Sequence, residues 1–292
     1  MFSDEFADAV EYAAGYTVLV DARKRLPASG VAFAADLIIT ADHAVEREEN
    51  IRVGLADGSL HPAALAGRDP SSDLALLRLE KPLLQPARRA EKEGRVGQMA
   101  VTVARPTLES VQAGLAMISA AGGPVRTMRG GLLRQYFRLD ATAYPGYSGG
   151  ALVDLSGGVL GINTSGLGGG VFLAIPAAVA WETAALLAQH GRIRRGYLGV
   201  RSQPVEIPES LRPLLQREQT HALLLVAVDG ATPAAEAGLM VGDLLTAIAG
   251  QPVTDADDLV AALSAGRVSV PTAVEILRGG SRLEVTVSIG ER

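Results

Sequence analysis

The chain has 292 residues, a formal net charge of −5 and 48% hydrophobic residues. This length suggests two domains, each large enough to bury a core, and the apolar content excludes a disordered chain. An acidic chain without a basic cluster is a poor candidate for a nucleic-acid partner. Because the sequence contains no cysteine, it has no disulfide, thiolate nucleophile or cysteine-based metal site. We expect neither a metal nor another cofactor.

The first eight residues are acidic and lack the basic start and apolar core of a secretory signal peptide. No stretch approaches 18 uninterrupted apolar residues, so we expect no membrane span. As written, the sequence is that of a soluble cytoplasmic protein. A mature form trimmed of a signal or anchor would look the same, and its location would then be the periplasm or the cell envelope.

The spacing of Phe2, Phe6, Val10 and Ala14 predicts a short helix over residues 1–14. From Tyr16 onward, short runs rich in β-forming residues alternate with Gly, Pro and Asp, which is typical of a closed barrel or a sandwich. Examples of these predicted strands are 16–20, 37–40, 51–55, 74–79, 100–103, 114–119, 132–139, 151–153, 159–163 and 171–175.

An Ala-rich helix is predicted over 176–190, ending at Gly191, and the polar segment 191–196 is a predicted linker. We therefore expect a first domain over 1–190 and a second over 197–292. The second domain mixes strands with two helices. Thr232 is the predicted N-cap of one helix, and Thr254–Asp257 has the form of a capping box that opens the other.

Ser148 stands among glycines in Gly146-Tyr-Ser-Gly-Gly150, directly before an apolar strand. The glycines remove Cβ atoms that would block a substrate carbonyl. They also allow the N–H groups of Gly146 and Ser148 to point at one spot, as in an oxyanion hole. A tight hairpin in an all-β protein would look similar, so the segment by itself leaves both interpretations open.

A serine nucleophile needs an imidazole that is oriented by a carboxylate. Of the four histidines, His43 follows the apolar strand 37–40 and faces whatever that strand end lines. The others have ordinary explanations in a loop, at a helix end and at a strand start: His61, His190 and His221.

Asp73 is the candidate carboxylate, because an acid that heads a buried apolar strand needs a hydrogen-bond partner. Asp42 is the competitor, but neighbours along a strand point to opposite faces, which makes it the weaker orienter of His43. The order His43, Asp73, Ser148 disfavours an α/β-hydrolase esterase, whose acid and histidine follow the serine. The nearly all-β pattern before Ser148 disfavours it as well.

With these segments in place, the chain resembles the HtrA (Deg) family of bacterial serine proteases. The matching segments are Leu37-Ile-Ile-Thr-Ala-Asp-His43-Ala-Val, Ser72-Asp73-Leu-Ala-Leu-Leu, Gly146-Tyr-Ser148-Gly-Gly-Ala-Leu, Leu160-Gly-Ile-Asn-Thr164, Leu173-Ala-Ile-Pro176, Arg195-Gly-Tyr-Leu-Gly-Val200 and Ala235-Glu-Ala-Gly-Leu-Met-Val-Gly-Asp243. The resemblance implies a mostly β fold, with a chymotrypsin-like double β-barrel protease domain followed by an α+β PDZ domain.

The resemblance also implies residue roles. Ser148 would attack the scissile carbonyl, His43 would carry the proton, and Asp73 would hold the imidazole, while the N–H groups of Gly146 and Ser148 bind the oxyanion. In the second domain, the PDZ carboxylate-binding loop would be Tyr197, Leu198, Gly199 and Val200, with a peptide tail adding as a strand. Leu259 and Leu263 would line its groove, although core packing explains them equally well.

The function implied is a serine endopeptidase that degrades unfolded or misfolded proteins and prefers a small or medium aliphatic residue before the cut bond. The segments Tyr144–Tyr147 and Ser165–Phe172 would form the pocket, and the PDZ domain would bind C-terminal tails for delivery or regulation. Family members are typically trimers, here through N-terminal aromatics: Phe2, Phe6, Tyr12 and Tyr16. Packing of the helix on its own barrel explains these residues as well. The short connection at Lys24–Ser29 argues against a large cage.

Two single positions and one three-residue block depart from the family pattern. Tyr147 replaces the usual Asn before the serine, and Pro145 replaces the usual Arg before the preceding glycine. The usual Gly-Asn-Pro block is altered to Ala104-Arg105-Pro106. Rotation about ψ of Pro145 and φ of Gly146 still allows the oxyanion hole to form. The alternative is a catalytically impaired, peptide-binding or chaperone-like member of the same fold.

Overall fold

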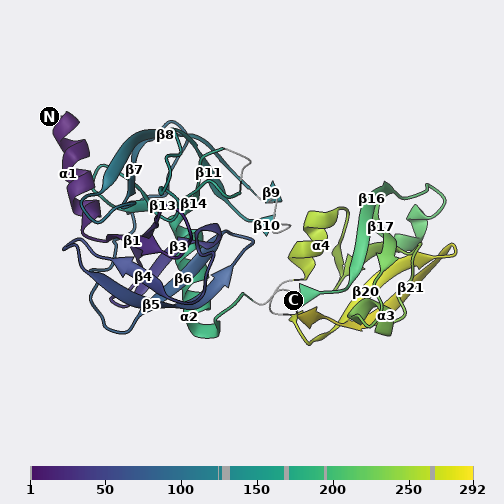
Figure 1. The fold of residues 1–292 in the computed structure, drawn as a ribbon. Helices are drawn as coiled ribbons and strands as arrows, with labels where there is room; N and C mark the ends of the chain where they lie inside the picture. Colours follow the sequence, from purple (N-terminus) through teal and green to yellow (C-terminus); the bar gives the residue numbers. More distant parts are fainter. Residues whose placement is uncertain are drawn as a thin grey trace. The chain divides into compact units, whose positions relative to one another are not determined.

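The computed structural model describes residues 2–123, 125–126, 132–167, 171–193, 196–263 and 267–291. Two compact units divide the chain, Met1–Ile193 and Arg194–Arg292. The first unit contains two closed six-stranded barrels, and the second is built on one antiparallel sheet (Figure 1). The predicted mostly β architecture of a double barrel followed by an α+β domain is confirmed.

The first barrel closes in the strand order β1-β2-β3-β6-β5-β4. Its strands are β1 (Thr17–Asp21), β2 (Ala28–Ala32), β3 (Leu37–Ala41), β4 (Ile51–Gly54), β5 (Leu60–Asp69) and β6 (Leu74–Leu79). β5 is absent from the predicted runs, because its sequence contains Pro62, three Ala and one Gly, which are weak strand formers. Every residue of β3 is buried, and the 3-10 turn η1 (Asp42–Ala44) follows it directly.

The second barrel closes in the order β11-β14-β13-β12-β7-β8. Its strands are β7 (Met99–Ala104), β8 (Gln112–Gly122), β11 (Tyr136–Asp140), β12 (Ala151–Val153), β13 (Val159–Thr164) and β14 (Leu173–Pro176). A small hairpin of β9 (Val125–Arg126) and β10 (Leu132–Leu133) lies between β8 and β11 in the chain. Ser148 lies in the loop that leads into β12.

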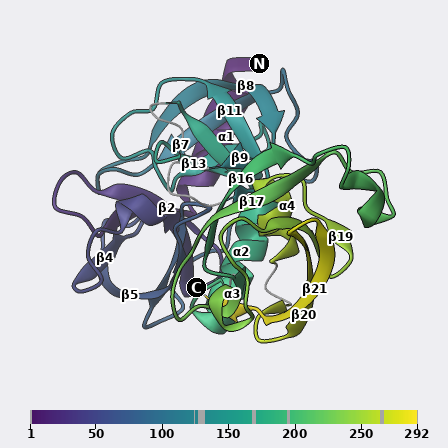
Figure 2. The same ribbon diagram turned by 90° about the vertical axis from the view of Figure 1, so that its right-hand side faces the viewer.

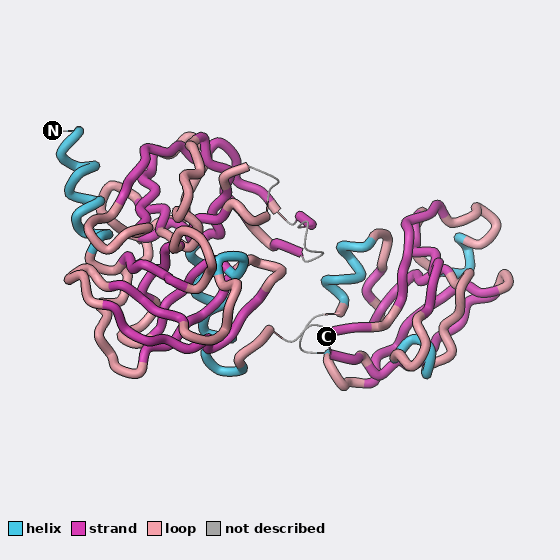
Figure 3. Tube along the Cα trace, in the orientation of Figure 1, coloured by secondary structure: helices cyan, strands magenta, loops and turns pink. Residues whose placement is uncertain are grey.

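Two helices lie on the outside of this strand-rich unit (Figure 3). α1 (Phe2–Ala14) packs against β7, and α2 (Ala177–His190) packs against β5, β6 and β13. α2 ends at Gly191, which is left-handed with φ 72° and donates its N–H to Leu187 O. Both the helix and its stop agree with the sequence pattern.

The second unit is an antiparallel sheet in the order β16-β17-β18-β20-β21, with β19 paired to β18 and a separate β15–β22 pair. Its strands are β15 (Gly196–Tyr197), β16 (Val200–Glu206), β17 (His221–Val228), β18 (Leu244–Ile248), β19 (Gln251–Pro252), β20 (Pro271–Arg278), β21 (Ser281–Ser288) and β22 (Gly290–Glu291). The helical elements are η2 (Arg212–Leu215), α3 (Pro233–Glu236) and α4 (Ala256–Ala262). β16 forms one edge of the sheet, and α4 packs beside it (Figure 2).

Two helix N-caps were predicted in this unit, one for α3 and one for α4, and the structure agrees with the first and not with the second. Thr232 caps α3 as predicted, since its hydroxyl accepts from Ala235 N–H. The capping box at Thr254 is wrong. Asp255 is the N-cap of α4, because its carboxylate reaches the N–H groups of Asp257 and Asp258, while Thr254 bonds to the Asp258 side chain.

Candidate active site

His43 and Asp73 lie side by side because β3 pairs with β6 in the first barrel, with Ala41 opposite Leu74. The Nδ1 atom of His43 is 2.7 Å from Oδ2 of Asp73. The backbone N–H of His43 also donates to Oδ1 of Asp73 at 2.9 Å. Two bonds from one residue therefore fix the imidazole relative to the carboxylate, the pairing expected from the sequence.

Asp73 is fully buried and has a left-handed backbone with φ 56°. Its carbonyl accepts from Asp42 N–H at 3.0 Å, and its carboxylate also accepts the hydroxyl of Thr164. Burial raises the pKa of this carboxyl, but the hydrogen bonds from the His43 ring, Thr164 and the His43 N–H outweigh burial, so its pKa lies below the usual aspartate value. Asp73 is thus held as a carboxylate.

Asp42, the other carboxylate next to His43, has a separate role. It is buried, and its Oδ1 accepts from Nε of Arg68 at 2.6 Å. The carboxylate that contacts the His43 ring is Asp73. The contacts agree with the choice of Asp73, but the strand-face argument for it was wrong, because Asp42 and His43 lie in the 3-10 turn η1 and not in a strand.

The loop before Ser148 begins with a tight turn over Tyr144–Tyr147. Tyr147 N–H donates to Tyr144 O at 3.2 Å, and Gly146 has φ 88°. With Pro145 and Gly146 at its central positions, the turn fits type II, which requires positive φ at the third residue. The N–H groups of Gly146 and Ser148 donate to no acceptor within the described residues. Two unused donors beside a serine hydroxyl are what an oxyanion hole needs.

The Ser148 hydroxyl itself bonds to Ser165, with 3.2 Å between the two Oγ atoms. In the part of the chain that the structure describes, no hydrogen bond joins Ser148 to the His43 ring. The structure thus brings His43 and Asp73 together, whereas the Ser148 hydroxyl is hydrogen-bonded to Ser165. In unliganded enzymes the bond from nucleophile to base is often long or unformed, so this arrangement does not exclude catalysis.

Thr164 and Ser165 contact this site, and no role was predicted for Thr164. Thr164 is the last residue of the buried strand β13 and bonds to Asp73, and Ser165 follows it and bonds to Ser148. The one available signal is the polar run Asn163-Thr-Ser165 after the apolar residues of this strand, which is as weak as any polar run at a strand end. Ser165 lies in a segment predicted to form a substrate pocket.

Part of the predicted substrate pocket, Tyr144–Tyr147 together with 165–167 and 171–172, lies within the described residues. Tyr144 is half exposed and Tyr147 is buried, with their ring centroids 5.5 Å apart, and Phe172 is buried. Burial, followed by the neighbouring Tyr144, raises the pKa of Tyr147. Residues 168–170 of the predicted pocket segment lie outside the described residues.

In the second unit, the two central residues of the predicted carboxylate-binding loop, Leu198 and Gly199, have bonded carbonyls and unbonded N–H groups. Leu198 O accepts from Ala234 N–H and Gly199 O accepts from Asp229 N–H, both at 2.9 Å. The N–H groups of Leu198 and Gly199 meet no acceptor among the residues described. Tyr197 pairs with Gly290, which anchors the start of the loop.

The two groove leucines differ in position. Leu259 is buried and belongs to the core of this unit, whereas Leu263 is partly buried and packs against that core. The carbonyl of Leu263 accepts from Gly196 N–H at 3.0 Å, which ties the end of α4 to the start of the carboxylate loop. The structure therefore favours core packing as the main role of Leu259.

Comparison with known proteins agrees with this geometry. Residues 28–162 match the trypsin-like peptidase domain family, and residues 196–289 match the PDZ domain family. A probable periplasmic serine endoprotease DegP-like of Rhizobium meliloti is 33% identical over 278 residues, 92% of this chain and 54% of the relative. The periplasmic pH-dependent serine endoprotease DegQ of Escherichia coli is 31% identical over 259 residues, 86% of this chain and 56% of the relative.

Among solved structures, the HtrA-type protease AlgW with a decapeptide matches with a TM-score of 0.81 at 26% identity, covering 98% of both chains. The serine endoprotease from Yersinia pestis matches with a TM-score of 0.81 at 28% identity, again over 98% of both chains. The chain belongs to the HtrA (Deg) family of serine proteases. It spans about half the length of the curated relatives named above.

The departures from the HtrA pattern are accommodated by the structure. Pro145 stands at the second position of a type II turn, which its fixed φ favours. Tyr147 packs into the core of the second barrel. Arg105 is buried, and its guanidinium donates to Thr17 O at 2.8 Å and to Ala14 O at 2.9 Å. Burial lowers the pKa of this guanidinium.

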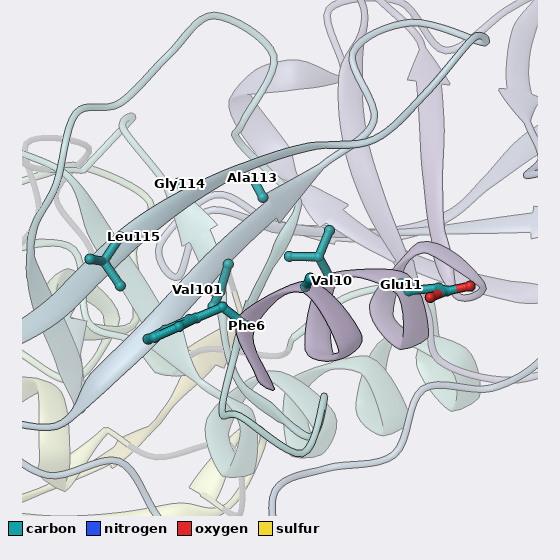
Figure 4. A pocket seen from close by; sticks show the side chains of 8 residues that line it. Phe6, Val10, Glu11, Val101, Ala113, Gly114 and Leu115 are labelled. Atoms are coloured by element: carbon teal, nitrogen blue, oxygen red, sulfur yellow. The ribbon is translucent and has the colours of Figure 1, made fainter. Parts of the chain in front are cut away.

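An apolar cavity of about 550 Å³ lies elsewhere in this HtrA-family unit, between α1, β7 and β8 (Figure 4). Its lining includes Phe6, Val10, Val101 and Leu115, and none of the candidate triad.

The described residues contain no cluster of His, Cys, Asp and Glu able to hold a metal ion. Nor does any helix within them have the length and apolarity to cross a membrane.

Proposed function

We propose that this chain is a serine endopeptidase that cleaves unfolded or misfolded polypeptides with His43, Asp73 and Ser148. The observation that carries the proposal is the two-point pairing of His43 with a buried, ionised Asp73. The unused N–H groups of Gly146 and Ser148 on the neighbouring loop complete the set of groups that acyl transfer needs.

The His43 tautomer follows from its partner. An ionised carboxylate only accepts hydrogen bonds, so Nδ1 of His43 carries the proton and Nε2 is left as a base. Ser148 turns from Ser165 toward Nε2 and gives up its proton as Oγ attacks the carbonyl carbon. The N–H groups of Gly146 and Ser148 stabilise the oxyanion, and His43 passes the proton to the leaving amine. Water then hydrolyses the acyl-enzyme by the same proton path.

We propose a small or medium aliphatic residue before the cut bond. The segments Tyr144–Tyr147 and Ser165–Phe172 contain no acid that would attract a basic side chain. The PDZ domain binds C-terminal tails for substrate delivery or regulation. The free donors of Leu198 and Gly199 and the open edge of β16 support this, as does the similarity to AlgW solved with a decapeptide.

A homotrimer and a periplasmic location complete the proposal. The location is supported by relatives that are named periplasmic. Of the N-terminal aromatics, Tyr16 is buried and its hydroxyl donates to Gly157 O, and Phe6 packs on the core of its own unit. Tyr12, 45% exposed, remains available for contact with another subunit, and light scattering of the purified chain tests the trimer.

The test of the proposed function is degradation of a reduced, unfolded protein beside its folded form, followed by mass spectrometry of the products. We expect wild type to cleave the unfolded form after small aliphatic residues, and Ser148→Ala and His43→Ala to leave it intact. Binding of the unfolded protein by wild type without any cleavage would contradict the proposal and favour a chaperone-like member of the fold.

A further inference from the structure

Ser29 lies in β2 of the first barrel, has no solvent exposure, and reaches across to the loop that carries the nucleophile. Its hydroxyl donates to Gly146 O at 2.7 Å. Its backbone N–H donates to Ser148 O at 3.1 Å. One residue of the first barrel therefore holds two carbonyls of a loop that belongs to the second barrel.

The direction of the hydroxyl bond follows from a third contact. The backbone N–H of Arg105 points at Ser29 Oγ with a distance of 2.8 Å. A backbone N–H can only donate, so Ser29 Oγ accepts this bond. The single hydroxyl proton is then left for Gly146 O, which can only accept. Arg105 thus orients the Ser29 hydroxyl toward the Gly146 carbonyl.

The peptide planes around Ser148 show what these bonds achieve. In the peptide after Gly146, the carbonyl is bonded to Ser29 and the N–H to Tyr144 O. In the peptide after Ser148, the carbonyl is bonded to Ser29 and the N–H to Asn163 O. These two fixed peptides leave the N–H groups of Gly146 and Ser148 free. Holding the fixed planes sets the directions in which the free donors point.

The approach of the loop to Ser29 depends on Gly149. This residue has φ 83°, and a Cβ built on it would lie 2.1 Å from Ser29 O. Only glycine allows that backbone contact. Ser29 O also accepts the hydroxyl of Thr40 at 2.7 Å, which holds this carbonyl in place.

We infer that Ser29 is a positioning residue for the oxyanion hole, acting through the Gly146 and Ser148 carbonyls, and the inference rests on the proposed function. Ser29 belongs to the same barrel as His43 and Asp73. Ser29 therefore also fixes the position of the loop that carries Ser148 relative to those two residues of the first barrel. Ser29 itself does not contact the substrate.

The test compares Ser29→Ala with Thr102→Val, a matched control. Thr102 is equally buried, and its hydroxyl donates to a carbonyl, Gly114 O at 3.0 Å, on the adjacent strand. Removing an oxyanion donor lowers kcat by about 10²–10³-fold, and Ser29 acts only by holding donors in place. We therefore expect Ser29→Ala to lower kcat for a peptide amide by about 10- to 100-fold, with KM within about threefold. Thr102→Val should keep both constants.

A second readout separates positioning from stability. A fluorophosphonate leaves a phosphonyl oxygen on Ser148 in the oxyanion hole, and the ³¹P resonance of the folded adduct differs from that of the denatured adduct. We expect Ser29→Ala to move the folded resonance toward the denatured position and Thr102→Val to leave it in place. If Ser29→Ala does not fold, Ser29→Cys, whose thiol is a weaker donor on a slightly larger side chain, should show the same changes in smaller degree.

The outcomes separate the two claims. If wild type shows no hydrolysis, or if Ser148→Ala does not abolish the hydrolysis, the proposed function fails whatever the Ser29 variants show. If wild type is active, an unchanged kcat and ³¹P resonance in the Ser29 variants overturn the role of Ser29. A loss of stability no larger than that of Thr102→Val, together with the lowered kcat, supports it.

Discussion

The Oγ atoms of Ser148 and Ser165 lie 3.2 Å apart, so the proposed nucleophile is bonded to a neighbouring serine and not to its proposed base. Before attack, the Ser148 side chain must leave this bond and turn to His43. The Ser165 contact therefore stabilises a resting state. Because turning toward His43 breaks this bond, its free energy is lost before the transition state.

Ser165→Ala should increase the reactivity of Ser148. A net hydrogen bond is worth about 0.5–1.5 kcal/mol, so the rate of phosphonylation by a fluorophosphonate should rise by about 2- to 10-fold. Ser119→Ala, which removes an exposed hydroxyl bonded to Arg138 O, is the control and should leave the rate unchanged. A tenfold fall in Ser165→Ala would show that this hydroxyl assists the reaction.

Asp73→Asn should lower kcat by about 10⁴-fold with little change in KM, because the amide supports the wrong tautomer of His43. Asp42→Asn is the matched control. Asp42 is another buried aspartate beside the same histidine, but it is paired with Arg68, and we expect less than a tenfold loss of kcat. Equal losses in the two variants would show that the carboxylate that orients His43 has been misassigned.

The lowered pKa of Asp73 makes a prediction for stability. Its ionised form stabilises the fold at pH values above the unfolded aspartate pKa of about 3.9, and this contribution is lost as pH falls through the lower folded pKa. Asp73→Asn should therefore weaken the acid dependence of unfolding below about pH 5. The single tryptophan, Trp181 in α2, reports on the first unit in urea titrations. An unchanged acid slope would contradict the ion pairing of Asp73.

The sequence predicts a contact in this site where the contact follows from the pairing of two recognisable strands, and it does not predict the other contacts. The apolar runs before His43 and after Asp73 predict two strands, and their pairing then brings the residues together. Ser29 shows the limit. Its partners Arg105 and Gly146 lie 76 and 117 residues away, and no periodicity links them. β5 was missed for a related reason, since its pairing in the closed barrel and not strand propensity holds its Ala-rich sequence.

Peptide binding by the PDZ domain should depend on a free carboxylate. The unused N–H groups of Leu198 and Gly199 are donors for an anion, and charge-assisted bonds are about twice as strong as neutral ones. We expect an apolar peptide with a free C-terminus to bind at least about tenfold more tightly than its C-terminal amide, measured by fluorescence anisotropy. Equal affinities would exclude this loop as the carboxylate site.

Labelling with a fluorophosphonate, with mass spectrometry to locate the adduct, tests the central claim most directly. The experiment compares wild type with Ser148→Ala, each with and without an apolar C-terminal peptide. We expect one adduct on Ser148 in wild type and none in the variant, because the proposed mechanism requires His43, Asp73 and the two N–H groups to act on that hydroxyl. Peptide-enhanced labelling would make the PDZ domain an activator. If wild type binds the peptide and forms no adduct under any of these conditions, the chain is a peptide-binding member of the fold and not a protease.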